Sequence, residues 1–260
     1  MIRKNFLYNI HFYLFLVILI FTFNVTKSQN LPDDSIEISA KGTMEWHQLE
    51  NKILASGNAE VKSKDFAIFA NKVTGFYEGK IGNGNIKKFI ASENARIETN
   101  HGIINADYIN YDFHLDKISV KGDNILMNLD QGTINASNNL VFIKKENRIK
   151  VAGDVKILIN EKGEIHAQQI IIHIDKKGNI KVVEAYKDVE ILLNLTQQKI
   201  TSNEAKFDNK NLQINLIGDV TLKQGRNFLK GDSAFLDLDK GISKILSTTT
   251  KSVNGVFFNQ

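Results

Sequence analysis

Two short motifs that recur six times constrain the fold of this chain more than any other feature. In the first, a Gly or small residue precedes Asn or Asp and an apolar-x-apolar run; its polar positions are Asn58, Asn94, Asn124, Asp154, Asp188 and Asp219. The second is aliphatic-x-small-polar, with small residues Ala70, Ala106, Ala136, Ala167, Ser202 and Gly231. Copies of the first motif lie 30 to 36 residues apart, and the second follows in step. Such periodicity is typical of one supersecondary unit stacked on its own copies.

Each unit reads as strand, turn, strand. Val220 and Leu222 alternate with Thr221 and Lys223, which is the period-two pattern of a half-buried strand. β-branched residues dominate, and Asn and Gly interrupt every few residues, so helix is excluded for most of the chain. We expect the first motif to begin a strand and Trp46 to cap the first hairpin as a core residue. The predicted hairpin turns are 161–163, 175–179, 208–211, 224–227 and 239–241.

The repeats run from residue 36 to residue 258 without a break in composition, which predicts one continuous all-β sheet stack. The small residue of the second motif is expected at a fold line, where two walls of a curved sheet approach closely. The alternative fold is a parallel β-solenoid, acting as a scaffold or adhesin with a dry core and no ligand in it. A solenoid would have shorter and stricter rungs than these units.

The N-terminal segment predicts export. Arg3 and Lys4 precede an apolar stretch over residues 6–25, and its densest part has the length of a signal-peptide core. We therefore expect residues 1–28 to be a signal peptide, or else an uncleaved membrane anchor, followed by a linker over 29–35. Either way, the basic flank stays on the cytoplasmic side and the rest of the chain is exported.

Several function classes are disfavoured. The chain has no cysteine, and its six histidines show no metal-ligand spacing, so we expect no metal and no cofactor. There is no nucleophile motif or carboxylate constellation, which argues against an enzyme, including one acting on polysaccharide. The net charge is +4, but without Arg3, Lys4 and Lys27 the chain carries 30 basic against 29 acidic residues. Nucleic-acid binding needs a clustered basic patch, so it is not expected.

At the repeats, the sequence resembles the OstA/LptA family of lipopolysaccharide-transport proteins. The resemblance begins at Ile36–Ala40, continues through Ile53–Val61, and is closest at Leu216–Asp237. It implies an open, mostly antiparallel β-jellyroll of about six strand-turn-strand repeats. It also implies a periplasmic protein that holds the acyl chains of lipopolysaccharide in an aliphatic interior and joins similar proteins edge to edge. The chain departs from the pattern where Glu93 and Lys187 replace the Gly before the polar residue.

The repeated inward-facing aliphatic residues are the candidate lipid groove, because a carrier needs a continuous apolar slot. They are Val61, Ile68, Ile97, Ile104, Ile125, Met127, Ile134, Val155, Ile157, Ile165, Val189, Ile191, Ile200, Val220, Leu222 and Leu229. The alternative for any one of them is ordinary packing in a sandwich core. The first and last strands, with Ile36, Ile38, Val253 and Val256, are the candidate docking edges for other β-jellyroll transport proteins or for self-association by strand addition.

Overall fold

The computed structural model describes residues 35–79, 85–247 and 252–258, and one compact unit extends from Ile36 to Gln260. The predicted signal peptide or anchor at 1–28, and the linker up to residue 34, lie outside the described residues. In the described ranges, no helix has the length and hydrophobicity that crossing a bilayer requires.

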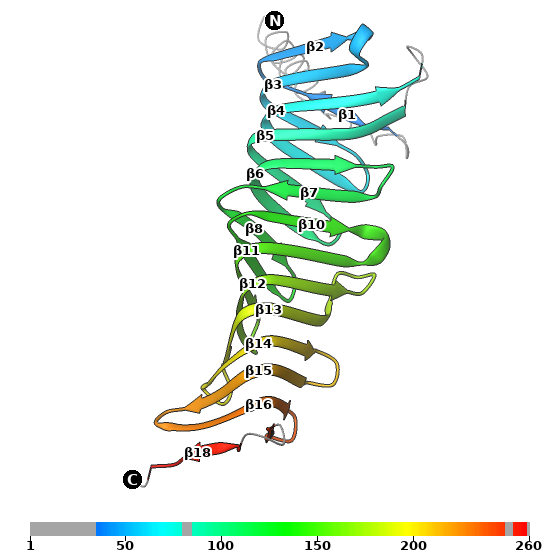
Figure 1. Ribbon diagram of the computed structural model, residues 1–260. Coiled ribbons are helices and arrows are strands. Elements are labelled where there is room, and N and C mark those ends of the chain that lie inside the picture. Colours follow the sequence, from blue (N-terminus) through cyan, green and yellow to red (C-terminus); the bar gives the residue numbers. More distant parts are fainter. Residues whose placement is uncertain (1–34, 80–84, 248–251, 259–260) are drawn as a thin grey trace, which may run out of the picture. The chain divides into compact units, whose positions relative to one another are not determined.

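The described residues form a single 18-stranded sheet with two short 3-10 turns (Figure 1). The first strands are β1 (Glu37–Ser39), β2 (Thr43–His47), β3 (Lys52–Lys62), β4 (Phe66–Glu78), β5 (Asn85–Thr99), β6 (Gly102–Asp112), β7 (Lys117–Lys121), β8 (Ile125–Leu129) and β9 (Gly132–Ala136). The others are β10 (Asn139–Ile143), β11 (Arg148–Ile159), β12 (Gly163–Ile174), β13 (Ile180–Leu193), β14 (Gln198–Asp208), β15 (Gln213–Gln224), β16 (Asn227–Asp237), β17 (Ile242–Leu246) and β18 (Asn254–Val256). The 3-10 turns are η1 (Gln48–Glu50) and η2 (Lys144–Glu146).

The strand pairings decide between the two folds considered from the sequence. Every described pairing, from β1 with β3 to β16 with β18, is antiparallel. The all-β, antiparallel jellyroll-like fold is therefore confirmed, and the parallel β-solenoid is wrong. The hairpin turns predicted from the Gly, Asn and Asp clusters also lie between consecutive strands, for example Gly225 and Arg226 between β15 and β16.

The long strands are folded in the middle, and the first sequence motif forms the corner. In β3 the pairing register skips from Ser56 to Ala59, and the skipped Gly57 and Asn58 have φ of 84° and 48°. The same jump occurs at the Gly-Asp pairs of β11 and β15. Two consecutive left-handed residues turn the strand sharply, and Gly, Asn and Asp tolerate that conformation best. The expectation that this motif begins a strand is right at Asn124, which directly precedes β8, and wrong for the other five copies, which bend strands of 11 to 15 residues.

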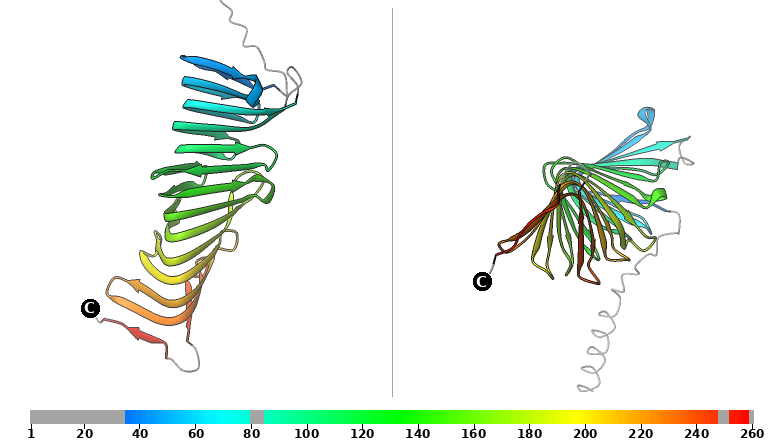
Figure 2. Two further views of the ribbon diagram at one scale, coloured as in Figure 1. Left: turned by 45° about the horizontal axis from the view of Figure 1, so that its top comes forward. Right: turned by 60° about the horizontal axis from the view of Figure 1, so that its bottom comes forward.

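Folding at the corners gives the sheet two walls. Wall A comprises β2, β7, β10, β17 and the halves of the long strands that pair with them; wall B comprises β1, β8, β9, β18 and the other halves. The small residue of the second motif lies beside the corner, as predicted: Ala70 pairs with Ala59 and Ala106 with Ala95. Viewed towards one end of the stack, the strands fan out from the corners (Figure 2), as the normal twist between neighbouring strands requires.

The core lies between the walls as one continuous hydrophobic cluster from Ala55 to Leu236. At one end of the stack β1 and β2 both pair with β3, and at the other end β17 and β18 both pair with β16. The prediction that Trp46 belongs to the core is wrong, because it lies on β2 at the end of wall A and is 53% exposed. Its indole Nε1 donates a hydrogen bond of 2.9 Å to the Tyr77 hydroxyl.

Candidate functional site

Wall B presents an unbroken aliphatic ladder to the interior. Its members face one another across each pair of strands and run in order Val61, Ile68, Ile97, Ile104, Met127, Ile134, Ile157, Ile165, Ile191, Ile200, Leu222 and Leu229. Branched aliphatic side chains pack well in such cross-strand rows. One row of a single chemical character thus extends through the described stack.

All sixteen groove candidates lie on the inner face of wall B. Twelve of them form the ladder, and Ile125, Val155, Val189 and Val220 lie one step closer to the corner, opposite Ala136, Ala167, Ser202 and Gly231. Fifteen of the sixteen are buried, and Leu229 near the end of the stack is partly buried. Through most of the stack these residues therefore pack against the opposite wall and do not line an empty slot.

The four edge candidates divide between the two ends. Ile38 on β1 pairs with Val61 and continues the ladder by one strand, and Ile36 is partly buried beside it. Val256 on β18 pairs with Phe228 and, like Val253, is exposed. Among the described strands, β1 pairs with β3 alone and β18 with β16 alone, so both lie at edges of the described sheet.

The sequence analysis missed the inner face of wall A, which covers the ladder. One wall A row near the corners is Ala55, Val73, Ala91, Ile109, Val120, Leu140, Val151, Ile170, Ala185, Ala205, Leu216 and Ala234. A parallel row nearer the mouth carries Phe89, Tyr111, Ile118, Phe142, Ile149, Ile172, Val183, Phe207, Ile214 and Leu236. A signal for both existed, because apolar-x-apolar pairs such as Ile149/Val151 and Ile214/Leu216 also precede the first motif.

We call the side opposite the corners, where the hairpin turns of the two walls meet, the mouth. Near the N-terminal end, an aromatic cluster joins the walls: Phe66 of wall B lies 5.1 Å from Tyr111 and 5.4 Å from Phe113 between ring centroids. Farther along, the ring of His101 in a wall B turn meets Phe142 of wall A edge to face at 5.5 Å. Such aromatic pairs stabilise by about 0.5–1.5 kcal/mol each beyond their buried area.

Two polar contacts continue this series across the mouth. The backbone N–H of Ile180 donates a 3.2 Å hydrogen bond to Gln131 Oε1. The Lys162 ammonium donates to Asn209 Oδ1 and lies 5.9 Å from the centre of the Phe207 ring. Each contact joins a wall B turn to a wall A segment, 49 and 47 residues later in the chain. The two walls are thus offset by about three strands where they face each other.

The electrostatics of the mouth follow from partial burial. Burial lowers the pKa of His101, and the nearby Lys144 lowers it further, while Asp175 and Asp116 oppose the shift. Among the described residues, none hydrogen-bonds the buried Nδ1 of His101. At the C-terminal end, the hydrogen bond from Lys240 holds the pKa of Asp237 below its usual value; the Nζ to Oδ2 distance is 2.8 Å. The side chain of Asp237 is nearly buried, whereas that of its partner Lys240 is 66% exposed, so the ion pair lies at the protein surface.

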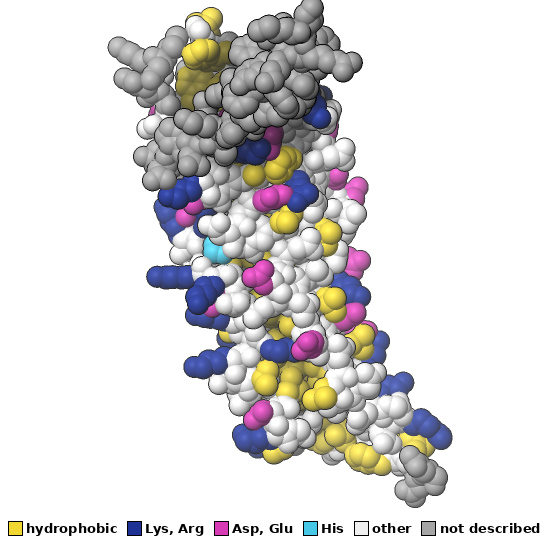
Figure 3. Space-filling view, turned by 180° about the vertical axis from the view of Figure 1, so that it is seen from behind, with side chains coloured by type: hydrophobic (Ala, Val, Ile, Leu, Met, Phe, Trp, Pro, Cys, Tyr) yellow, Lys and Arg dark blue, Asp and Glu magenta, His cyan; other side chains and the backbone are white. Residues whose placement is uncertain are grey.

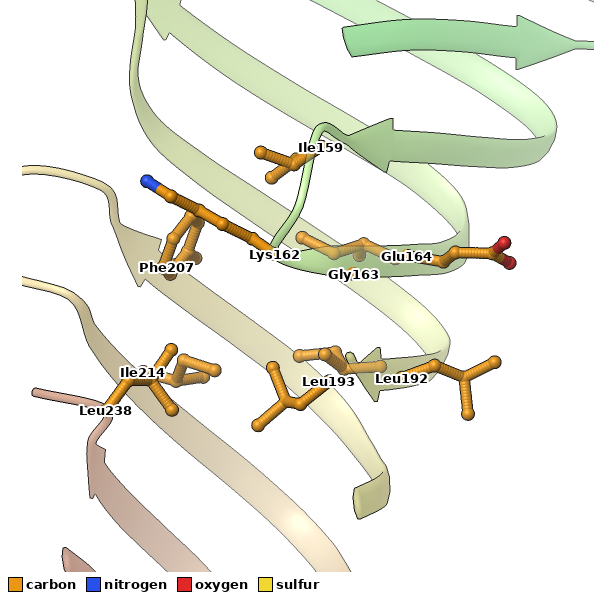
Figure 4. A pocket seen from close by; sticks show the side chains of 11 residues that line it. Ile159, Lys162, Gly163, Glu164, Leu192, Leu193, Phe207, Ile214 and Leu238 are labelled. Carbon is orange, nitrogen blue, oxygen red and sulfur yellow. The ribbon is translucent and has the colours of Figure 1, made fainter. Parts of the chain in front are cut away.

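Towards the C-terminal strands the described walls separate. A cavity of about 340 Å³ lies between the wall B turns 160–162 and 193–198 and the wall A residues Leu212, Asp237, Leu238 and 241–243. A cavity of about 20 Å³ adjoins it and reaches the ladder residues Ile165 and Ile191. In Figure 4, Ile159 and Leu193 approach this second cavity from one wall, and Phe207, Ile214 and Leu238 from the other. Figure 3 shows hydrophobic side chains gathered on the surface in the half that carries the C-terminal strands.

The described residues contain no group of His, Asp and Glu side chains placed to hold a metal ion. The carboxylates of the turns instead stabilise the turns themselves. Asp208, for example, accepts hydrogen bonds from the backbone N–H groups of Lys210 and Asn211 at 3.0 and 3.1 Å. The chemistry that this structure offers is an extended apolar interior between two walls.

Comparison with known proteins agrees with that geometry. Residues 133–242 match the family model described as "LptA/(LptD N-terminal domain) LPS transport protein". Over these residues the chain is similar to the OstA/LptA family, and the resemblance seen in the repeats is thereby confirmed. The matched stretch runs from β9 to the start of β17 and includes the adjoining cavities at the C-terminal mouth.

A solved structure is also similar. It is the crystal structure of LptH, described as the LptA homologous periplasmic component of the conserved lipopolysaccharide transport device from Pseudomonas aeruginosa. The match covers 88% of this chain and 100% of the LptH chain. The identity is 10% and the TM-score is 0.22, so the fold assignment rests on the strand pairing and not on this likeness. No curated protein matches this chain.

Proposed function

We propose that this protein is a periplasmic carrier or bridge in lipopolysaccharide transport, which shields the acyl chains of the lipid between walls A and B. The observation that carries the proposal is the aliphatic ladder from Val61 to Leu229, faced by the apolar rows of wall A. The family match over residues 133–242 supports the same role, because the family is described by lipopolysaccharide transport.

The energetics allow acyl chains to replace the contacts between the two walls. Each buried methylene contributes about 0.8 kcal/mol whether it lies against isoleucine or against a fatty acyl chain. Parting the walls and inserting acyl chains therefore replaces one aliphatic contact by another at small net cost. Within the long strands, walls A and B are joined at the corners. There, pairs of left-handed residues interrupt the pairing between neighbouring strands, so the corners form a line along which the sheet is bent.

The sheet edges are the proposed partner surfaces. β1 and β2 at one end, and β17 and β18 at the other, each have one described neighbour strand along most of their length. Unpaired strand edges bind further strands readily. We propose that Ile36 and Ile38 on one edge, and Val253 and Val256 on the other, contact other β-jellyroll transport proteins or a second copy of this chain.

The rest of the assignment follows from export. We propose that a domain over residues 36–258 works in the periplasm, after a leader over 1–28 and a linker over 29–35. If the leader is not cleaved, it anchors the domain to the inner membrane on the periplasmic side. We further propose that the protein has no catalytic activity and uses no metal, cofactor or nucleic acid.

A second candidate function is favoured by one observation, the burial of fifteen of the sixteen groove candidates. An exported antiparallel scaffold that binds no lipid would have the same dry interior. Its partners would bind only at the edge strands.

Mass spectrometry of material that co-purifies with the exported protein separates the two functions. The full chain is produced in a bacterium whose outer membrane contains lipopolysaccharide and is isolated without detergent. A lipid carrier retains lipid A species in a stoichiometric amount. Protein that is free of lipid A, even after incubation with purified lipopolysaccharide, would support the scaffold and exclude the carrier.

A further inference from the structure

The two polar contacts across the mouth have nearly the same separation in sequence, and the next position of this series carries two apolar side chains. Gln131 and Ile180 are 49 residues apart, and Lys162 and Asn209 are 47 apart. The next position in the same series joins Leu195, in the turn between β13 and β14, to Ile242 at the start of β17, again 47 residues later. Both side chains are apolar, so neither side chain can form a polar contact across the mouth.

Their exposure marks this position as an opening. Leu195 is 88% exposed and Ile242 is 53% exposed, although both border the cavity of about 340 Å³. Leu193, Leu212 and Leu238 form the rest of its apolar lining. Pockets for small ligands begin at about 300 Å³ and are mostly apolar with a few polar groups. The volume therefore suits one ligand segment and not a whole multi-chain lipid.

We propose that this cavity is where a single fatty acyl chain passes from the side into the interior, between the turn carrying Leu195 and the start of β17. The inference rests on the proposed lipid-carrying function and adds to it the entrance. The smaller cavity shares Lys162, Leu193 and Leu238 with it and is lined on its other side by Ile165 and Ile191 of the ladder. An acyl chain that entered at Leu195 would thus reach wall B directly.

Lys162 lies at the inner boundary of the entrance, because it lines both cavities. Its ammonium donates to Asn209 and lies over Phe207, so it spans from wall B to wall A. Beyond it, Gln131 and His101 make the next contacts across the mouth. The walls therefore open in order from the C-terminal end, and Lys162 is the first contact that a longer or second acyl chain displaces.

Photocrosslinking locates the entrance in the full-length exported protein. A benzophenone amino acid replaces Leu195 in one variant and Leu49 in another. Leu49 is the matched control, since it is also a fully exposed leucine in a turn at the mouth, at the other end of wall A. With purified lipopolysaccharide as the probe, we expect an adduct at position 195 that is at least tenfold stronger than at position 49. Equal adducts at both positions would overturn the proposed entrance.

Substitution gives the second readout. Leu195→Asp should lower lipopolysaccharide binding at least tenfold, whereas Leu49→Asp should leave it unchanged; both side chains are exposed, so neither variant should lose its fold. If the wild-type protein retains lipopolysaccharide and Leu195→Asp binds it equally well, the proposed position of the entrance is refuted and the carrier function stands.

A free saturated fatty acid is the third arm. If wild type binds no lipopolysaccharide, the proposed function falls. The fatty acid then tests whether the cavity binds an acyl chain: a crosslinked adduct at position 195 supports an acyl-chain site there, and the absence of an adduct overturns it.

Discussion

The corners predict a stabilising substitution at Lys187. Gly occupies the first corner position in β3, β11 and β15, with φ of 84° at Gly57, 87° at Gly153 and 80° at Gly218. In β13 the same position is Lys187, which is exposed and has φ of 64°. A residue with a Cβ in this left-handed region costs about 1–2 kcal/mol relative to Gly. Lys187→Gly removes that cost.

The gain is partly offset in the unfolded chain, where Gly has more conformational freedom by about 0.5–1 kcal/mol. We therefore expect Lys187→Gly to raise the free energy of unfolding by about 0.5–1 kcal/mol. Equilibrium urea unfolding measures this as a higher midpoint with an unchanged slope. Lys187→Ala is the matched control: it deletes the same side chain but keeps Cβ, so it should give no gain.

The reverse change should be harmful. At Gly153 a Cβ would lie 2.4 Å from the Cβ of Asn138, so Gly153→Ala meets both the backbone strain and a clash. It should destabilise by more than about 1 kcal/mol. The reasoning about the corners would be refuted if Lys187→Gly were no more stable than Lys187→Ala.

Three further outcomes follow from the interior and the mouth. Ile157→Ala should lower the free energy of unfolding by about 2–5 kcal/mol in the absence of lipid, because it opens a cavity in a fully buried row; denaturant unfolding checks it. Burial lowers the pKa of His101 in the folded protein, so near the ordinary histidine pKa of about 6.5 the unfolded chain binds more protons than the folded one. The folded state therefore loses stability as the pH falls through that value. Thermal unfolding of His101→Gln between pH 7.5 and 5.5 should lack this loss. The hydrogen bond from Lys240 lowers the pKa of Asp237, so the Asp237 carboxylate stabilises the fold above the ordinary aspartate pKa of about 3.9. This stabilisation is lost as the pH falls below that value. In Asp237→Asn, the melting temperature should therefore fall less steeply at acidic pH than in the wild type.

Sequence reasoning reached the inner face of wall B and stopped there. The ladder residues were recognisable because each follows the repeated polar anchor at a nearly constant interval, and alternation then assigns them to one face. The apolar residues before each anchor, such as Ile149 and Val151, carry the same alternation. They were missed because the anchor was interpreted as the start of a strand, and only the register jump between Ala152 and Val155 shows that one strand continues through it.

The sequence by itself determined the repeat, the antiparallel hairpins, the fold line of small residues and the aliphatic row, because all of these depend on local pattern and turn chemistry. Only the tertiary structure decided that the walls pack closed through most of the stack, and that the wall B turns at Gln131 and Lys162 face wall A segments 49 and 47 residues later. That pairing depends on the accumulated twist of the sheet and on side chains distant in sequence, such as Phe66 with Tyr111. Leu195 and Ile242, 47 residues apart in sequence, line one cavity only because the chain folds in this way.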